Sequence, residues 1–287
     1  MVDDGLSEIT AAAAWLHQGA DQLPASPEII PAGSAAEAAA AVTSGVATGT
    51  PINAAVVDLG LGPRQPSGLA VLKLLDDAGI PSAVWVNWGD RGGRLMFVYA
   101  AFTWYKPVAL MPKAKSTPGA ARDTAPQDFA RNIARISRGE SPSPDISSHF
   151  RPRQGCAWPF SRVLSSPADL RNWRAFLTYS QTAAIAHHLG IGPGAIDKWL
   201  AEKYDEVWKL IDHASVYMEV DDVDIAAPPD RARTRRMDEK REPDRAGSRR
   251  KDEKREYVDR KASLVQFARS QSWFFNDPVV IARYTAR

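Results

Sequence analysis

The stretch Ala54-Ala55-Val56-Val57-Asp58 decides the fold of the first half of the chain, because it contains the clearest buried strand in the sequence. Its first four residues are apolar on both faces, which is typical of a strand in a parallel sheet that helices cover on two sides. Residues 81–86 and 108–111 have the same character and predict two more strands. Apolar residues at helical spacing predict helices over residues 7–16, 36–46, 68–78 and 127–137. This alternation predicts an α/β domain over residues 1–140.

The composition is that of an ordinary folded protein with more than one domain. The chain has 287 residues, of which 44% are hydrophobic and 24% are charged, and these values exclude a disulfide scaffold, collagen and whole-chain disorder. The formal net charge of +2 does not by itself indicate a nucleic-acid-binding protein. A single cysteine, Cys156, cannot form an intrachain disulfide, and no apolar run reaches the ~18 residues of a membrane span. We therefore expect a soluble, cytoplasmic protein with no membrane partner.

The second half of the chain divides by composition into four parts. Residues 141–167 are rich in Pro, Ser and Arg and predict a linker, and residues 168–218 predict a helical unit. Residues 219–260 carry a dense charge run in which the segment 235–242 recurs in similar form at 249–256. Acids and bases alternate there, which favours a solvated helix or a disordered tether over an arm that binds DNA. The aromatic tail, residues 261–287, is apolar enough to dock onto another part of the molecule.

Carboxylates follow the strands of the predicted sheet. Asp3 and Asp4 follow the short start of the chain, and Asp58 ends the clearest strand. Ligands of an open parallel sheet bind at the carboxyl ends of its strands, so these side chains are expected to face one crevice. Three carboxylates there can hold Mg²⁺, and a carboxylate beside that metal can accept a phosphoryl group.

The order of these segments resembles the receiver domain of the response regulators of two-component signalling. The resemblance covers about residues 1–140 and implies a flavodoxin-like fold in which Asp58 accepts the phosphoryl group and Asp3 and Asp4 hold Mg²⁺ with it. It also implies a lysine that pairs with the phosphoryl oxygens, for which Lys113 is the candidate and Lys106 the alternative. Asn87 stands where the family has a hydroxyl residue in the same pocket.

Three departures from the family pattern bear on phosphorylation. Only Met1 and Val2 precede Asp3, so either the first strand is degenerate or the natural start lies upstream. Asn87 replaces the usual hydroxyl, and the loop that follows Asp58 is longer than in the family. We therefore expect aspartyl phosphorylation to be weak or absent, and we leave open whether a histidine kinase is a partner.

Residues 177–200 predict a helix-turn-helix. A helix with Ala184, Ile185 and Leu189 inward ends at Gly190, and a second helix begins near Pro193. The segment resembles the DNA-binding domains of LuxR-type regulators, in which the second helix enters the major groove. That resemblance gives these candidate DNA-binding residues: Thr178, Gln181, Gly194, Ala195, Asp197 and Lys198.

Together these patterns predict a receiver-like α/β domain followed by an all-α helix-turn-helix domain. We expect a dimeric, DNA-binding transcriptional regulator and, because no nucleophile and base converge, not an enzyme. The alternative is an adaptor whose two domains contact proteins. The neutral charge of residues 173–209, with four cations and four acids, favours that alternative, because DNA affinity depends on neutralising phosphates.

Overall fold

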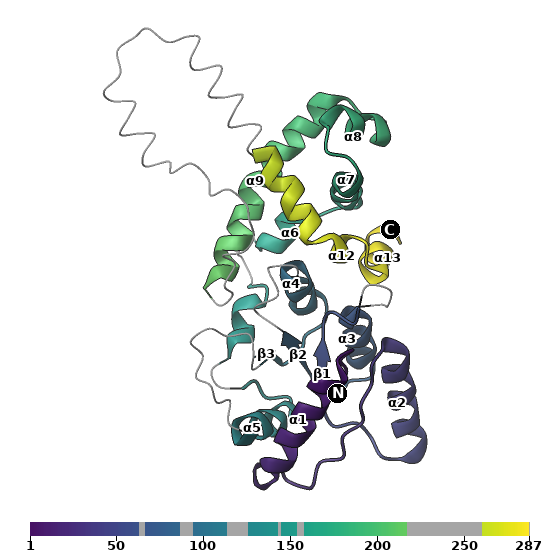
Figure 1. The fold of residues 1–287 in the computed structure, drawn as a ribbon, viewed down its shortest axis with the longest axis vertical. Coiled ribbons are helices and arrows are strands. Elements are labelled where there is room, and N and C mark those ends of the chain that lie inside the picture. The colour runs from purple at the N-terminus through teal and green to yellow at the C-terminus, as the bar shows by residue number, and fades with distance from the viewer. Residues whose placement is uncertain are drawn as a thin grey trace, which may run out of the picture.

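The computed structural model describes residues 1–62, 67–86, 94–113, 126–142, 145–153, 158–216 and 260–286. Asn87, Cys156 and the duplicated charge run lie outside these ranges. Within them, every helix is too short or too polar to serve as a membrane span. Figure 1 shows a sheet flanked by helices in the lower half of the molecule and a group of helices in the upper half.

Three parallel strands form the centre of the lower half, and all three were predicted from the sequence. They are β1 (Ala55–Asp58), β2 (Ser82–Val86) and β3 (Ala109–Pro112), side by side in that order. Val2 extends the sheet beyond β1 through a parallel bridge to Val57, and Ala32 forms a parallel bridge to Val2 on the other side. The order across the sheet is therefore Ala32, Val2, β1, β2, β3.

Helices cover both faces of this sheet. Alternate strand residues pack to opposite sides: Val56 and Trp85 belong to one apolar cluster, and Val57 and Val84 belong to another. On the first face lie α1 (Leu6–Gln18) and α5 (Pro126–Ile136); on the second lie α2 (Ala35–Thr48), α3 (Gly68–Asp77) and α4 (Leu95–Trp104). Of these helices, the sequence did not predict α4, because its residues are apolar on all sides and show no helical period.

The upper half consists of helices, and the segment expected to be a linker is part of the packed structure. Phe150 and Phe160, both within 141–167, are fully buried. The described elements of this half are η2 (Ile146–Phe150), α6 (Pro159–Val163), α7 (Pro167–Thr178), α8 (Thr182–Leu189), α9 (Pro193–Ser215), a helix that includes residues 260–270, α12 (Ser272–Phe275) and α13 (Pro278–Thr285). One further short helix, η1 (Ala20–Gln22), belongs to the lower half.

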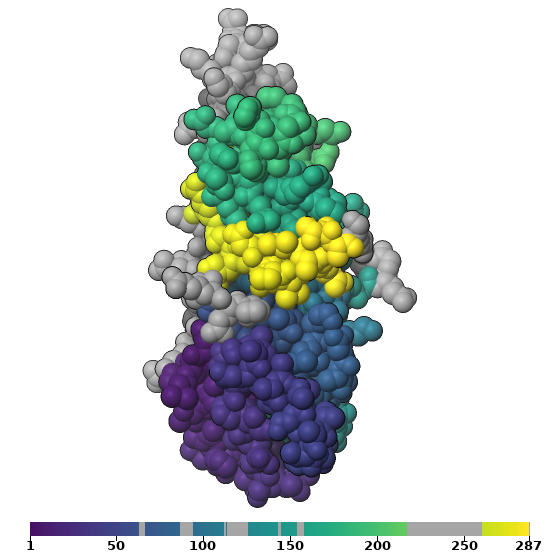
Figure 2. Space-filling model, turned by 90° about the vertical axis from the view of Figure 1, so that its right-hand side faces the viewer, coloured from purple at the N-terminus to yellow at the C-terminus, as the bar shows by residue number. Residues whose placement is uncertain are grey.

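The aromatic tail lies between the two halves, as the yellow band in Figure 2 shows. Phe274 contacts Phe97 of α4, with 5.3 Å between ring centroids, and Phe275 stacks on Trp173 of α7 at 5.4 Å. Residues of α3, α4, α6 to α9 and the tail belong to one continuous apolar cluster. The two halves therefore share a core, and the tail packs against both of them; the sequence predicted that the tail docks onto another part of the molecule but did not indicate which part.

Candidate functional site

Three carboxylates meet at the carboxyl end of β1. Asp3 follows Val2, and Asp58 ends β1, the neighbour of Val2 in the sheet, so the parallel direction of the chain brings both to one edge. Asp3, Asp4 and Asp58 each offer a carboxylate oxygen within 4.8 Å of the others. Asp3 and Asp58 are buried, whereas Asp4 is exposed. The structure thus brings together the three acids that the sequence analysis singled out.

Lys113 joins this cluster directly after β3. Its Nζ lies 2.5 Å from Asp3 Oδ2 and 3.0 Å from Asp58 Oδ2, and 5.0 Å from the ring centroid of Trp85. Burial opposes the charged ammonium, but the attraction of Asp58 and Asp3 outweighs it and raises the pKa of Lys113. Lys106, the alternative candidate, is exposed. Lys113 is therefore the lysine placed against the acids, and it is charged at neutral pH.

Arg94 is a second cation at Asp58, and the sequence analysis missed it. Arg94 Nη1 lies 2.5 Å from Asp58 Oδ1, and the backbone N–H of Gly60 donates to the same oxygen at 3.1 Å. A Cβ atom on Gly60 would lie only 2.3 Å from the Arg94 guanidinium, so a side chain at this position would push the guanidinium away from its present place. The only local signal in the sequence is that glycine, two residues after the strand-ending aspartate.

The donor set fits a hard divalent cation by its chemistry, but two internal cations already pair with two of its three carboxylates. Asp3, Asp4 and Asp58 supply the carboxylate oxygens that Mg²⁺ prefers. Burial raises the pKa of Asp3, while hydrogen bonds from Lys113 and the Gly5 N–H act in the opposite direction. Arg94 and Lys113 each occupy one oxygen of Asp58. Mg²⁺ held by these acids would therefore have to displace Arg94 or share Asp58 with it. Asn87, the remaining candidate for this pocket, lies outside the described residues.

Two helices joined by a short turn, α8 and α9, lie in the upper half where the sequence predicts a helix-turn-helix. Gly190 ends α8 with a φ of 67°, the left-handed conformation that glycine adopts without strain, and α9 begins at Pro193. Ile185 of α8 and Ile196 of α9 are fully buried. Of the six candidate DNA-binding residues, Asp197 is half-buried. The other five are exposed: Thr178, Gln181, Gly194, Ala195 and Lys198.

Two residues of α9 support the packing instead of the outer surface. Lys203 is buried, its Nζ lies 2.9 Å from Asp169 Oδ2, and it donates to the carbonyl of Arg162 at 2.6 Å. Trp199 Nε1 donates to the other oxygen of Asp169 at 2.7 Å. Because Lys203 faces inward, three of the four cations counted over residues 173–209 remain outside, against the same four acids. This arrangement makes the surface slightly less favourable for phosphate than the sequence count indicates.

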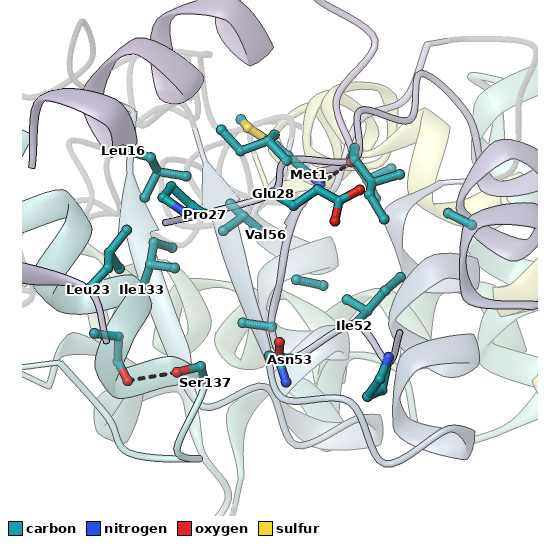
Figure 3. Close-up of a pocket in the computed structure, with 18 of the residues that line it drawn as sticks. Met1, Leu16, Leu23, Pro27, Glu28, Ile52, Asn53, Val56, Ile133 and Ser137 are labelled. Atoms are coloured by element: carbon teal, nitrogen blue, oxygen red, sulfur yellow. Dashed lines mark hydrogen bonds between the residues drawn. The ribbon is translucent and has the colours of Figure 1, made fainter. Parts of the chain in front are cut away.

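A cavity of about 570 Å³ lies at the opposite, amino end of β1 (Figure 3). Leu16 of α1, Ile133 of α5 and Val56 of β1 line it, and Glu28 is the one charged side chain among the lining residues of the described chain. A largely apolar cavity with a single carboxylate side chain among its lining residues brings no group of chemically active side chains together. The carboxylate cluster is therefore the candidate site for chemistry in the lower half.

Comparison of this chain with protein-family models, with curated proteins and with solved structures finds no match.

Proposed function

We propose that the protein is a DNA-binding transcriptional regulator of the response-regulator type, with a flavodoxin-like, receiver-like lower half and a helix-turn-helix in the upper half. The observation that carries the proposal is the exposed first turn of α9, which follows the Gly190 turn and rests on α8 through Ile185 and Ile196. A helix presented in this way fits the major groove of DNA. The protein acts in the cytoplasm as a dimer and has no catalytic activity of its own.

The lower half supports the receiver-like part of this proposal. The order Ala32, Val2, β1, β2, β3 matches that of a flavodoxin-like sheet, in which the strand that comes first in the chain lies second from one edge. Asp58 and Lys113 lie at the end of that sheet where ligands bind. We propose that Mg²⁺ reaches this site poorly and that phosphorylation is weak or absent, because Arg94 and Lys113 already pair with both oxygens of Asp58. A histidine kinase is then not required for function.

The alternative, a protein-interaction adaptor, keeps one specific observation in its favour. Lys203 is internal, and the outer surface of residues 173–209 therefore has a small excess of acids. Phosphate attraction must then come from cations elsewhere, since each phosphate contact adds to both affinity and salt dependence. A protein partner would need no such surplus.

Binding to a library of random-sequence duplexes at 50 mM salt, followed by selection and sequencing, tests the proposal. We expect a short preferred motif, which Ala195→Glu on the exposed first turn of α9 should abolish by placing a carboxylate against the DNA. Lys198→Ala should weaken binding about 5- to 150-fold, the range for a side chain that reads a base. Lys209→Ala is the matched control, because Lys209 pairs with Glu206 on a later turn of the same helix. Failure to enrich any motif would favour the adaptor.

A further inference from the structure

The tail contacts the first turns of both helices that border the carboxylate cluster. We infer that residues 260–285, here called the C-terminal clasp, link the state of the Asp58 ion pair to the packing of the helix-turn-helix. The inference goes beyond DNA binding, because it holds whether the upper half contacts DNA or a protein.

The first anchor is Gln271, which caps α4. The side chain of Gln271 is fully buried, and its Oε1 accepts a hydrogen bond from the Met96 N–H at 3.1 Å. That N–H lies in the first turn of α4, where a helix has no internal acceptor to offer. Arg94 directly precedes α4, and its carbonyl accepts from the Val98 N–H at 3.0 Å. The start of α4 is therefore held from one side by Asp58, through Arg94, and from the other side by the clasp.

The second anchor is Asp277, which reaches the start of α3. Asp277 is buried, and its Oδ2 accepts from the Ser67 N–H at 3.3 Å while its Oδ1 caps α13 through the Val279 N–H at 2.8 Å. Gly68, the next residue after Ser67, packs so tightly on Asp58 that a Cβ would lie 2.1 Å from the Asp58 carbonyl oxygen. The clasp thus holds the backbone that lies directly against the strand-ending aspartate.

On its other side the clasp packs against the helices of the upper half. Phe267 and Phe275 contact Trp173 of α7, with ring centroids 5.5 and 5.4 Å apart, and Trp173 contacts Trp199 of α9 at 4.8 Å. The Tyr284 hydroxyl donates to the carbonyl of Leu164 at 2.9 Å. These contacts form an unbroken series from Asp58 through Arg94, α4 and the clasp to α9.

This arrangement couples the two ends because α4 has two anchors only two residues apart. When Arg94 leaves Asp58, the first turn of α4 loses one of its two anchors. The Met96 N–H that donates to Gln271 is then no longer held in place. A change that loosens the clasp must in turn loosen the Arg94–Asp58 pair, since coupling free energies are reciprocal. Any ligand or substitution that removes Arg94 from Asp58 therefore weakens the contact of the clasp with α7.

Hydrogen exchange measured by mass spectrometry on the full chain tests this inference in both directions. Arg94→Gln should speed exchange of the amides in residues 264–275 by at least about fivefold, the lower end of typical coupling between sites. Arg131→Gln is the matched control, because Arg131 also pairs with an aspartate in the lower half, Asp128, but on α5. In the reverse direction, Gln271→Met, which keeps the size and removes the acceptor, should speed exchange of residues 96–100.

Three outcomes would overturn the inference. The first is acceleration by Arg94→Gln that stays within α4, and the second is an effect on the clasp no larger than that of Arg131→Gln. The third is equal acceleration of β1 to β3 and of the clasp, because it would indicate general destabilisation instead of a link. None of these variants alters the exposed face of α9, so this result and the DNA-binding result can fail separately.

Discussion

Replacing Phe274 by alanine tests whether the tail is part of the core. The Phe274 ring is fully buried and contacts the rings of Phe97, Phe160 and Trp104 at centroid distances of 5.3, 6.1 and 6.3 Å. Phe→Ala substitutions in cores cost about 3–5 kcal/mol, and these rings, fixed on α4 and α6, cannot all move into the space left behind. We therefore expect a loss of about 4 kcal/mol of unfolding free energy, which lowers Tm by roughly 8–16 °C for a chain of this size.

Urea unfolding followed by circular dichroism and by tryptophan fluorescence measures this loss. Trp273→Ala is the control, because Trp273 is the preceding residue and is 49% exposed. Surface substitutions of this kind change stability by about 0.5 kcal/mol or less. Equal unfolding midpoints for Phe274→Ala and Trp273→Ala would refute the claim that the tail completes a core shared by both halves.

Four further predictions concern the buried charges and the proposed function. Lys113→Met leaves Asp3 and Asp58 without their shared cation and should cost about 3–5 kcal/mol at pH 7 and less at pH 4.5, because burial raises the pKa of Asp3 and this carboxylate takes up a proton first; urea unfolding at both values measures the difference. Burial, with smaller effects of His149 and Arg153, lowers the pKa of His213 to about 4. The unfolded chain therefore binds the proton more readily; discounted for solvent screening of this partly exposed imidazole, the fall in stability between pH 6.5 and 4 should be roughly 1–2 kcal/mol larger in the native chain than in His213→Gln, as thermal unfolding will show. Incubation with acetyl phosphate and Mg²⁺ should add little phosphoryl mass by intact-protein mass spectrometry; rapid full modification that Asp58→Asn abolishes would contradict this. Light scattering at micromolar concentration should report about twice the mass of one chain, since helix-turn-helix proteins commonly read two half-sites as dimers.

The parts of the fold that sequence reasoning predicted are those with a regular pattern. β1 and β2 are short runs of buried, mostly apolar residues, and α5 has a strongly one-sided apolar face, so the strands could be assigned from their apolar runs and the helix from its period. Nine of the ten residues of α4 are apolar or aromatic and the helix has no polar side, because the sheet covers one face and the clasp and α6 cover the other. Burial on all sides removes the periodic signal by which an amphipathic helix is recognised.

The candidate site was predicted only where strand order determines it. Asp3, Asp58 and Lys113 each follow a strand of one parallel sheet, and their meeting follows from that topology. Arg94 could not be found in this way, because the path of the chain before α4 sets its position. Lys203 was counted as a surface cation, since its partner Asp169 lies 34 positions away and only the packing of α7 on α9 brings the two together. Pairings between distant charges are the part of the site that local patterns do not contain.

The most direct test of the central claim is the sequencing of DNA cross-linked to the protein in its own cells, for the native chain and for Ala195→Glu. We predict that one short motif is enriched with the native chain and that the variant, present at the same level and folded, loses it. Enrichment of no motif with the native chain, or of the same motif with both proteins, would contradict the claim that the exposed first turn of α9 reads DNA.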